Sequence, residues 1–218
     1  PWTLPSNVAL CVNPDETYVK VKAADGYTYY MAQALLDTVL GRLATEDKPA
    51  YEILETYMGK DLERREYEPL YACAGECAEK QHKKGFFITC DNYVTMTDGT
   101  GIVHIAPAFG EDDNLVFRGS GVPNVEPIDA ECKFTSEVSD YKGRFVKDCD
   151  KDICDRLKAE KKHVKKEQYE HSYPHCWRCS SPLIYRGIGS WFVKVADYHK
   201  ELLNSNSQIK WQPAHIKE

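Results

Sequence analysis

The order of the apolar runs is the sequence feature that most limits which folds this chain can adopt. Short β-rich runs, such as those at 85–90 and 101–107, are separated by glycine, aspartate and asparagine. Helical patterns are inserted between them, but strands and helices do not alternate regularly. Because a doubly wound parallel sheet requires that alternation, the order predicts a mixed α and β fold with an antiparallel β-barrel core and inserted peripheral helices.

Hydrophobic periodicity locates the individual elements. Acidic residues after Gly110 suit the positive end of a helix, and Asp148 and Asp150 are N-cap candidates for a later one. The segment 50–59 fits either a short helix or a strand. We expect strands at 7–14 and 17–24, joined by a turn at 13–15, and at 85–90, 92–96, 101–107, 167–177 and 182–195, with helices at 29–46, 111–121, 148–163 and 196–206.

Size and composition exclude several classes of protein. The chain has 218 residues, of which 42% are hydrophobic, so it can bury a substantial core. The net charge of −6 argues against a general nucleic-acid coat. No apolar run approaches the ~20 residues that span a bilayer, so no membrane association is expected. Nine cysteines without a regular framework favour a reducing compartment, which predicts a cytoplasmic location.

A basic cluster interrupts the acidic background between 158 and 166. The simpler interpretation is a solvated helix face, and contact with phosphates is the alternative. The members of this cluster are Lys158, Lys161, Lys162, Lys165 and Lys166.

The segment 99–113, with the sequence GTGIVHIAPAFGEDD, combines a strand, a tight loop and the start of a helix. Gly99 and Gly101 permit positive φ or close approach of another group, and this order of elements commonly forms a pocket rim. A phosphate loop is excluded because no Gly-Lys-Ser/Thr follows, and no serine or cysteine nucleophile is paired with a base. A helix-capping aspartate and an internally satisfied histidine would explain the same residues without a ligand.

The opening motif PWTLPSN, at 1–7, and the segment 99–113 together resemble the editing domain of isoleucyl-tRNA synthetases. In that family this domain, called connective polypeptide 1, is an insertion in the catalytic domain. The resemblance continues through GKDLERREYEPLY, HSYPHCWRCSSPLIYR and WFVKV to WQPAHIKE, and so covers nearly the whole chain. The valyl and leucyl relatives usually open with Thr-Thr-Arg-Pro and carry another residue at His104, which favours the isoleucyl family.

The resemblance implies a proofreading hydrolase that performs post-transfer editing of valyl-tRNA(Ile). Isoleucine and valine differ by one methylene, which an apolar pocket discriminates by only ~1–3 kcal/mol, and this synthetase is the usual illustration of that limit. The alternative is a module that binds the tRNA acceptor end without hydrolysing it. The chain, which begins with Pro1, would be a fragment of a larger synthetase, with an editing core at about 1–170 and a return segment at about 171–218.

The resemblance also implies roles for individual residues. Asp113 would hold the α-ammonium group of the misattached amino acid, and His104 would limit side-chain size and help to place the 3′-terminal adenosine. A water positioned by the pocket and by a ribose hydroxyl would attack the ester without a covalent intermediate. The family's run of threonines before Pro1 is absent. The expected substrate-binding residues are Trp2, Thr3, Asn7, Gly99, Thr100, Gly101, Ala106, Pro107, Ala108 and Phe109.

The expected partners are the 3′ end of tRNA(Ile) carrying valine and the rest of the synthetase chain. No cofactor is expected for this chain, whereas the full-length enzyme would use ATP and Mg. Cys176 and Cys179 have the spacing of half a zinc site, which leaves a zinc-organised interaction domain as a third hypothesis. His171 and His175 would complete such a site only if the fold placed them together, and we expect no bound metal.

Overall fold

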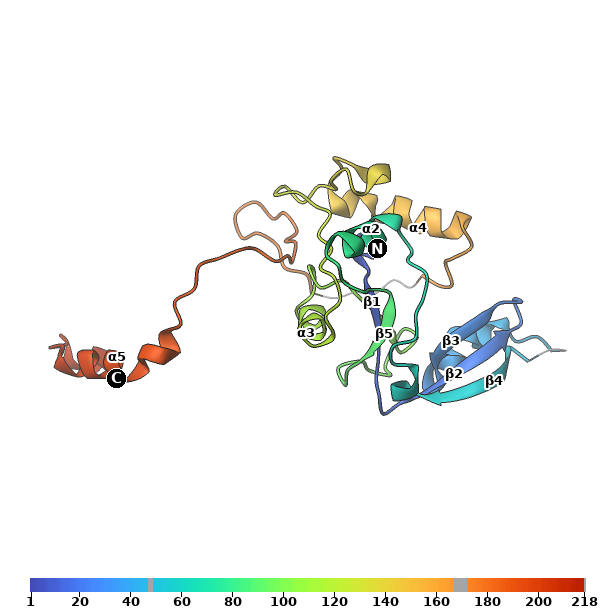
Figure 1. Ribbon diagram of the computed structural model, residues 1–218, viewed down its shortest axis with the longest axis horizontal. Coiled ribbons are helices and arrows are strands. Elements are labelled where there is room, and N and C mark those ends of the chain that lie inside the picture. Colours follow the sequence, from blue (N-terminus) through green and yellow to red (C-terminus); the bar gives the residue numbers. More distant parts are fainter. Residues whose placement is uncertain (47–48, 167–171, 218) are drawn as a thin grey trace. The chain divides into compact units, whose positions relative to one another are not determined.

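A computed structural model describes residues 1–46, 49–166 and 172–217 (Figure 1). The chain divides into two compact units, Pro1–Arg186 and Gly187–Glu218. The second unit contains α5 (His199–Gln208), which follows the 3-10 helix Val195–Tyr198. All the strands and the segment 99–113 belong to the first unit.

The first unit contains two small sheets. One consists of β1 (Ala9–Val12), β5 (Phe87–Cys90) and β6 (Ile102–Ile105) in the order β5-β1-β6, with β1 parallel to β5 and antiparallel to β6. The other is antiparallel and consists of β2 (Thr17–Ala23), β3 (Thr28–Ala32) and β4 (Tyr51–Met58) in the order β3-β2-β4.

The predicted antiparallel barrel is therefore wrong, although the mixed α and β class is correct. The described residues form two three-stranded sheets and no closed barrel. A sheet closes into a barrel only when it has enough strands for its two edge strands to pair with each other, whereas each sheet here has only three strands. The parallel pairing arises because β5 returns beside β1 only after the β3-β2-β4 module has been inserted between them.

Helices cover the β5-β1-β6 sheet and its ends. They are α2 (Ala72–Lys80), α3 (Glu111–Ser120) and α4 (Asp150–Ala159), and Figure 1 shows α2 and α4 near the start of β1. The short helix α1 (Leu36–Leu40) lies between two 3-10 turns. The helix predicted over 29–46 is wrong in its first part, because residues 28–32 pair with β2 instead. Aromatic side chains at these positions favour a strand.

Three other expectations need correction. The segment 92–96 is a turn rather than a strand, and Asp91 Oδ1 accepts the Tyr93 N–H within it at 3.0 Å. The predicted turn at 13–15 is present, and it joins β1 to β2, which belong to different sheets. Residues 182–195 contain no strand. Of the predicted strand over 167–177, residues 167–171 lie outside the described residues, and the remainder forms only the isolated bridge between His175 and Pro182.

Three apolar clusters stabilise this arrangement. The first joins the β3-β2-β4 sheet to α1 and includes Tyr18 and Leu40. The second joins β1, β5 and β6 to α2 and α3 and includes Phe87. The third packs around α4, and Trp2 and Phe109 lie against it. The segment 99–113 consequently runs from the first cluster to the third.

The loop before β6 is tied to the neighbouring sheet at Gly101. The Tyr18 hydroxyl donates a hydrogen bond to the Gly101 carbonyl at 2.7 Å, and the Ala32 N–H donates to the Thr100 carbonyl at 2.9 Å. Gly101 has φ of +72°, and a Cβ there would lie 2.5 Å from the Cβ of Ala32. Glycine is therefore required for both its conformation and its lack of a side chain.

Replacing Gly101 with alanine is expected to lower the free energy of unfolding by about 3 kcal/mol, from left-handed strain and overlap together. Gly99→Ala is the matched control, because Gly99 has φ of +67° but a Cβ there would meet nothing within 4 Å. The control should lose only about 1 kcal/mol. Urea unfolding of both variants checks the difference, and equal losses would refute the packing explanation.

Candidate active site

The connection between β6 and α3 is held by side chains from the first turn of the helix. Asp113 Oδ2 accepts the Ala106 N–H at 2.9 Å, and Asn114 Nδ2 donates to the Pro107 carbonyl at 3.1 Å. A Cβ at Gly110 would lie 3.0 Å from Asp113 Cγ, so the loop passes close to this carboxylate. The start of α3 is thereby tied to the end of β6, which restricts where the Asp113 carboxylate can lie.

Asp113 is half-buried, and its surroundings partly destabilise the ionised form of its carboxylate. Burial raises its pKa above the ordinary value, the hydrogen bond from the Ala106 N–H lowers it, and nearby Asp112 raises it. The first turn of α3 provides a positive helix end. Among the described residues, Asp113 Oδ1 accepts no hydrogen bond. One oxygen therefore fixes the loop, and the other has no hydrogen-bond partner among the described residues.

His104 lies on β6, opposite Leu10 of β1. Its Nε2 lies 3.1 Å from Thr3 Oγ1, and its buried Nδ1 has no hydrogen-bond partner among the described residues. Burial lowers the pKa of His104 to about 4, so its imidazole is neutral at physiological pH. A neutral ring with a vacant nitrogen can form a hydrogen bond with a ligand without adding positive charge.

The pKa of His104 predicts a pH dependence of stability. Because its folded value of about 4 lies below the ordinary value of 6.5, the unfolded chain binds this proton more tightly. Stability should therefore decrease as pH falls from 6.5 towards 4, by up to about 1.4 kcal/mol per pH unit. Urea unfolding across this range should show a shallower decrease for His104→Gln. An unchanged slope would contradict the burial of a neutral imidazole.

The opening residues contact both this histidine and the loop that follows β6. Trp2 packs edge-on against Phe109, with ring centroids 4.8 Å apart, and the Trp2 backbone N–H donates to Asp150 Oδ1 at 2.9 Å. Ala106 and Ala108 are buried beside the same loop. The structure thus brings Trp2 and Phe109 together, and the Thr3 hydroxyl to His104.

Other expected substrate-binding residues have different surroundings. Asn7 is 6% exposed, and its amide group donates to the Ala9 carbonyl at 2.9 Å and accepts from the Tyr67 hydroxyl at 2.6 Å. Gly99 and Thr100 line a separate cavity of about 350 Å³. Asn7 and Gly101 therefore support the fold from inside, whereas Gly99 and Thr100 face a different hollow.

The cysteine pair does not complete a metal site in the part of the chain that the structure describes. No group of three or more His, Cys, Asp or Glu side chains is placed there to hold a metal ion. Cys179 lies 3.3 Å from the Ser181 hydroxyl, which lowers its pKa to about 7. His171 lies outside the described residues. Across the described ranges, no helix is long and apolar enough to cross a membrane.

The sequence of the whole chain matches isoleucine–tRNA ligases. It is 51% identical over 224 residues to the enzyme of Treponema denticola and 44% identical over 219 residues to that of Bdellovibrio bacteriovorus, with all of this chain covered in each case. The chain is homologous to a segment of isoleucine–tRNA ligases. It spans about one fifth of the length of these relatives, because the alignments cover 20% of each. No protein-family model matches the chain.

The fold has a counterpart among solved structures. The crystal structure of GlLeuRS-CP1, a leucyl-tRNA synthetase CP1 domain, superposes with a TM-score of 0.57 and 15% identity, covering 78% of this chain and 82% of that one. At this identity the likeness concerns the fold alone. The chain therefore has a mixed α and β fold similar to that of a synthetase CP1 domain.

Sequence reasoning did not identify two contacts that support the fold around the candidate site. Asp150 was expected only as a helix cap, but the N-cap is Cys149, and Asp150 binds the Trp2 N–H instead. Tyr67 was not singled out, although it donates to Asn7. Both contacts join residues at least 60 positions apart, and no local pattern signals them.

Proposed function

We propose that this chain hydrolyses valine from misacylated tRNA(Ile), as the editing domain of an isoleucine–tRNA ligase. The observation that carries the proposal is the Asp113 carboxylate, which is fixed through one oxygen and has the other available. Asp113 lies in the helix that follows the strand carrying the neutral His104, and the chain is homologous to a segment of isoleucine–tRNA ligases. The tRNA acceptor end and the rest of the synthetase chain are the proposed partners.

Asp113 would bind the α-ammonium group of the esterified valine. A charge-assisted hydrogen bond in a half-buried site is shorter and stronger than one between neutral groups. An arriving ammonium would also offset the burial that raises the pKa of Asp113. The same contact would orient the ester carbon, because the amine is attached to the adjacent carbon.

His104 would form the wall that admits valine and rejects isoleucine. Its neutral ring does not repel the ammonium, and its contact with the Thr3 hydroxyl restricts its rotation. The vacant Nδ1 would form a hydrogen bond with the terminal adenosine. Trp2 and Phe109 would form the adjoining wall.

The reaction would be direct hydrolysis of the aminoacyl ester. A water held by the pocket and by a ribose hydroxyl attacks the acyl carbon, and the bond from this carbon to the ribose oxygen breaks. Valine leaves as the free acid, and the ribose oxygen takes up a proton. Positioning of the amine and the water would supply most of the rate enhancement. ATP and Mg would serve only the complete synthetase, and the proposed location is cytoplasmic.

The direct test is a deacylation assay in which the chain is incubated with valyl-tRNA(Ile) and isoleucyl-tRNA(Ile). We expect rapid loss of valine and retention of isoleucine. Binding of a non-hydrolysable valyl-adenosine analogue without any release of valine would instead support the alternative of an acceptor-end binding module. That outcome would reject hydrolysis by this chain.

A further inference from the structure

A cavity outside the proposed editing site lies between the β2–β3 hairpin and the end of α4. Its volume is about 380 Å³, within the range of about 300–1,000 Å³ that is usual for ligand sites. Lys158, Lys161 and Lys162 line it together with Tyr27 and Tyr29. The basic cluster therefore borders a concave site that includes two aromatic rings, rather than a uniformly solvated helix face.

The acidic groups near this cavity are already engaged. Asp25 Oδ1 accepts the Tyr27 N–H at 2.9 Å, and its Oδ2 accepts the Tyr29 hydroxyl at 2.8 Å. Both oxygens of the Asp25 carboxylate are therefore used within the hairpin. The two rings are held 6.2 Å apart by centroid, and Tyr27 is 48% exposed. Its ring is thus available for stacking.

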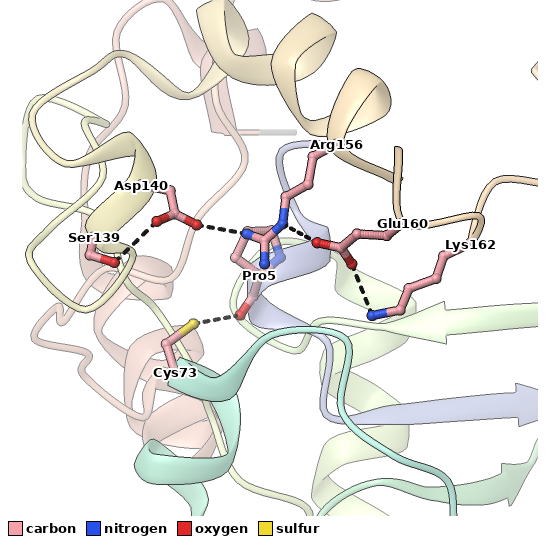
Figure 2. Close-up of polar contacts among 7 residues, drawn as sticks. All are labelled: Pro5, Cys73, Ser139, Asp140, Arg156, Glu160 and Lys162. Carbon is pink, nitrogen blue, oxygen red and sulfur yellow. Dashed lines mark hydrogen bonds and ion pairs between the residues drawn. The ribbon is translucent and has the colours of Figure 1, made fainter. Parts of the chain in front are cut away.

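The ion pairs at the end of α4 neutralise Glu160 (Figure 2). Arg156 contacts Glu160 at 2.7 Å and Asp140 at 2.7 Å, and Lys162 contacts the second oxygen of Glu160 at 2.9 Å. Lys158 and Lys161 form no ion pair with any residue that the structure describes. The cavity consequently has an excess of positive charge, and a concave surface strengthens the resulting potential.

The backbone carbonyl groups at the C-terminus of α4 repel an anion only weakly. The Lys162 N–H donates to the Leu157 carbonyl at 2.9 Å, and the Lys161 N–H donates to the Lys158 carbonyl at 3.1 Å. These carbonyls are satisfied within the turn, where Lys161 has φ of +55°. Ammonium groups near a helix C-terminus also offset its partial negative charge.

We propose that this cavity binds a backbone phosphate of RNA and that Tyr27 stacks on an adjacent base. Lysines that contact phosphates beside an exposed aromatic ring are a general means of binding unpaired RNA. The choice of tRNA as this RNA rests on the proposed function. The contact lies outside the proposed editing site, so it would hold the RNA without taking part in hydrolysis.

Affinity for uncharged tRNA(Ile), measured by fluorescence anisotropy at several salt concentrations, tests the proposal. In the double variant Lys158→Ala/Lys161→Ala, affinity at low salt should fall about tenfold, and the slope of log affinity against log salt should decrease by about 1 to 2. The control is Lys142→Ala/Lys151→Ala, which removes two exposed lysines outside the cavity. Equal effects in the two double variants would overturn the proposal.

Two further measurements separate stacking from charge and RNA from free phosphate. Tyr27→Ala should weaken binding about tenfold without changing the salt slope, and unchanged affinity would overturn the stacking contact. Inorganic phosphate should compete with RNA only at concentrations at which salt of the same ionic strength weakens binding equally. Competition below 1 mM would instead indicate a free phosphate ligand. Because binding alone is measured, lysine-dependent binding without deacylation would reject the proposed function and retain this inference.

Discussion

Replacing Asp113 with asparagine is expected to reduce hydrolysis of valyl-tRNA(Ile) by about 100-fold or more. Removal of one charge from a buried, hydrogen-bonded ion pair costs about 2–5 kcal/mol, and the asparagine amide cannot attract the ammonium as a carboxylate does. The amide oxygen can still accept the Ala106 N–H. The variant therefore retains the loop contact while it loses the negative charge.

Stability separates this effect from a structural one. Because burial raises the pKa of Asp113, its ionised form destabilises the folded chain at neutral pH, and Asp113→Asn removes that cost. We expect Asp113→Asn to unfold at the same urea concentration as the unsubstituted chain or at a higher one. Asp112→Asn is the matched control, since Asp112 lies exposed in the same helical turn and should retain nearly full activity. Full hydrolysis by Asp113→Asn would eliminate the assigned role.

Replacing His104 with alanine is expected to allow hydrolysis of isoleucyl-tRNA(Ile). Removal of the imidazole vacates more volume than the single methylene that distinguishes isoleucine from valine. The rate on isoleucyl-tRNA(Ile) should rise to within about tenfold of the rate on valyl-tRNA(Ile), because a methylene alone is worth only ~1–3 kcal/mol. Deacylation assays on both substrates measure the ratio.

His104→Gln is the control for this specificity change. Glutamine has a similar length and is uncharged, so it should continue to exclude isoleucine. If His104→Ala leaves isoleucyl-tRNA(Ile) intact, or if both variants hydrolyse it equally, His104 does not control the size of the pocket.

Local patterns predicted the elements that local interactions determine. The helix expected over 111–121 is α3 at Glu111–Ser120, and its acidic first turn matches the positive helix end. The strand expected over 101–107 is β6 at Ile102–Ile105. In both cases the relevant pattern lies within about ten residues, so neighbouring residues suffice to define it.

The errors arose where distant segments decide the outcome. The helix predicted over 29–46 includes residues 29–32, which instead pair with β2, and β1 pairs in parallel with β5, which lies more than 70 residues away. The barrel prediction rested on the irregular order of strands and helices along the chain. Sheet closure depends on strand number and on the return path of the chain, neither of which is a local property.

The candidate site shows the same division. The positions of His104 on the strand and Asp113 in the first turn of the helix, on either side of the connecting loop, followed from the sequence. The lowered pKa of His104 and the hydrogen bond from Ala106 to Asp113 required the packed structure, because both depend on burial and on the path of the loop. The hydrogen bond from the Trp2 backbone N–H to Asp150 joins residues 148 positions apart, and no local sequence pattern signals it.

A crystal structure of the chain with a non-hydrolysable valyl-adenosine analogue provides the most direct test. We predict that the amine nitrogen lies about 2.7–3.0 Å from a carboxylate oxygen of Asp113, with the valine methyl groups against His104. An analogue bound with its amine facing other residues, while Asp113 contacts only the Ala106 N–H, would contradict the account.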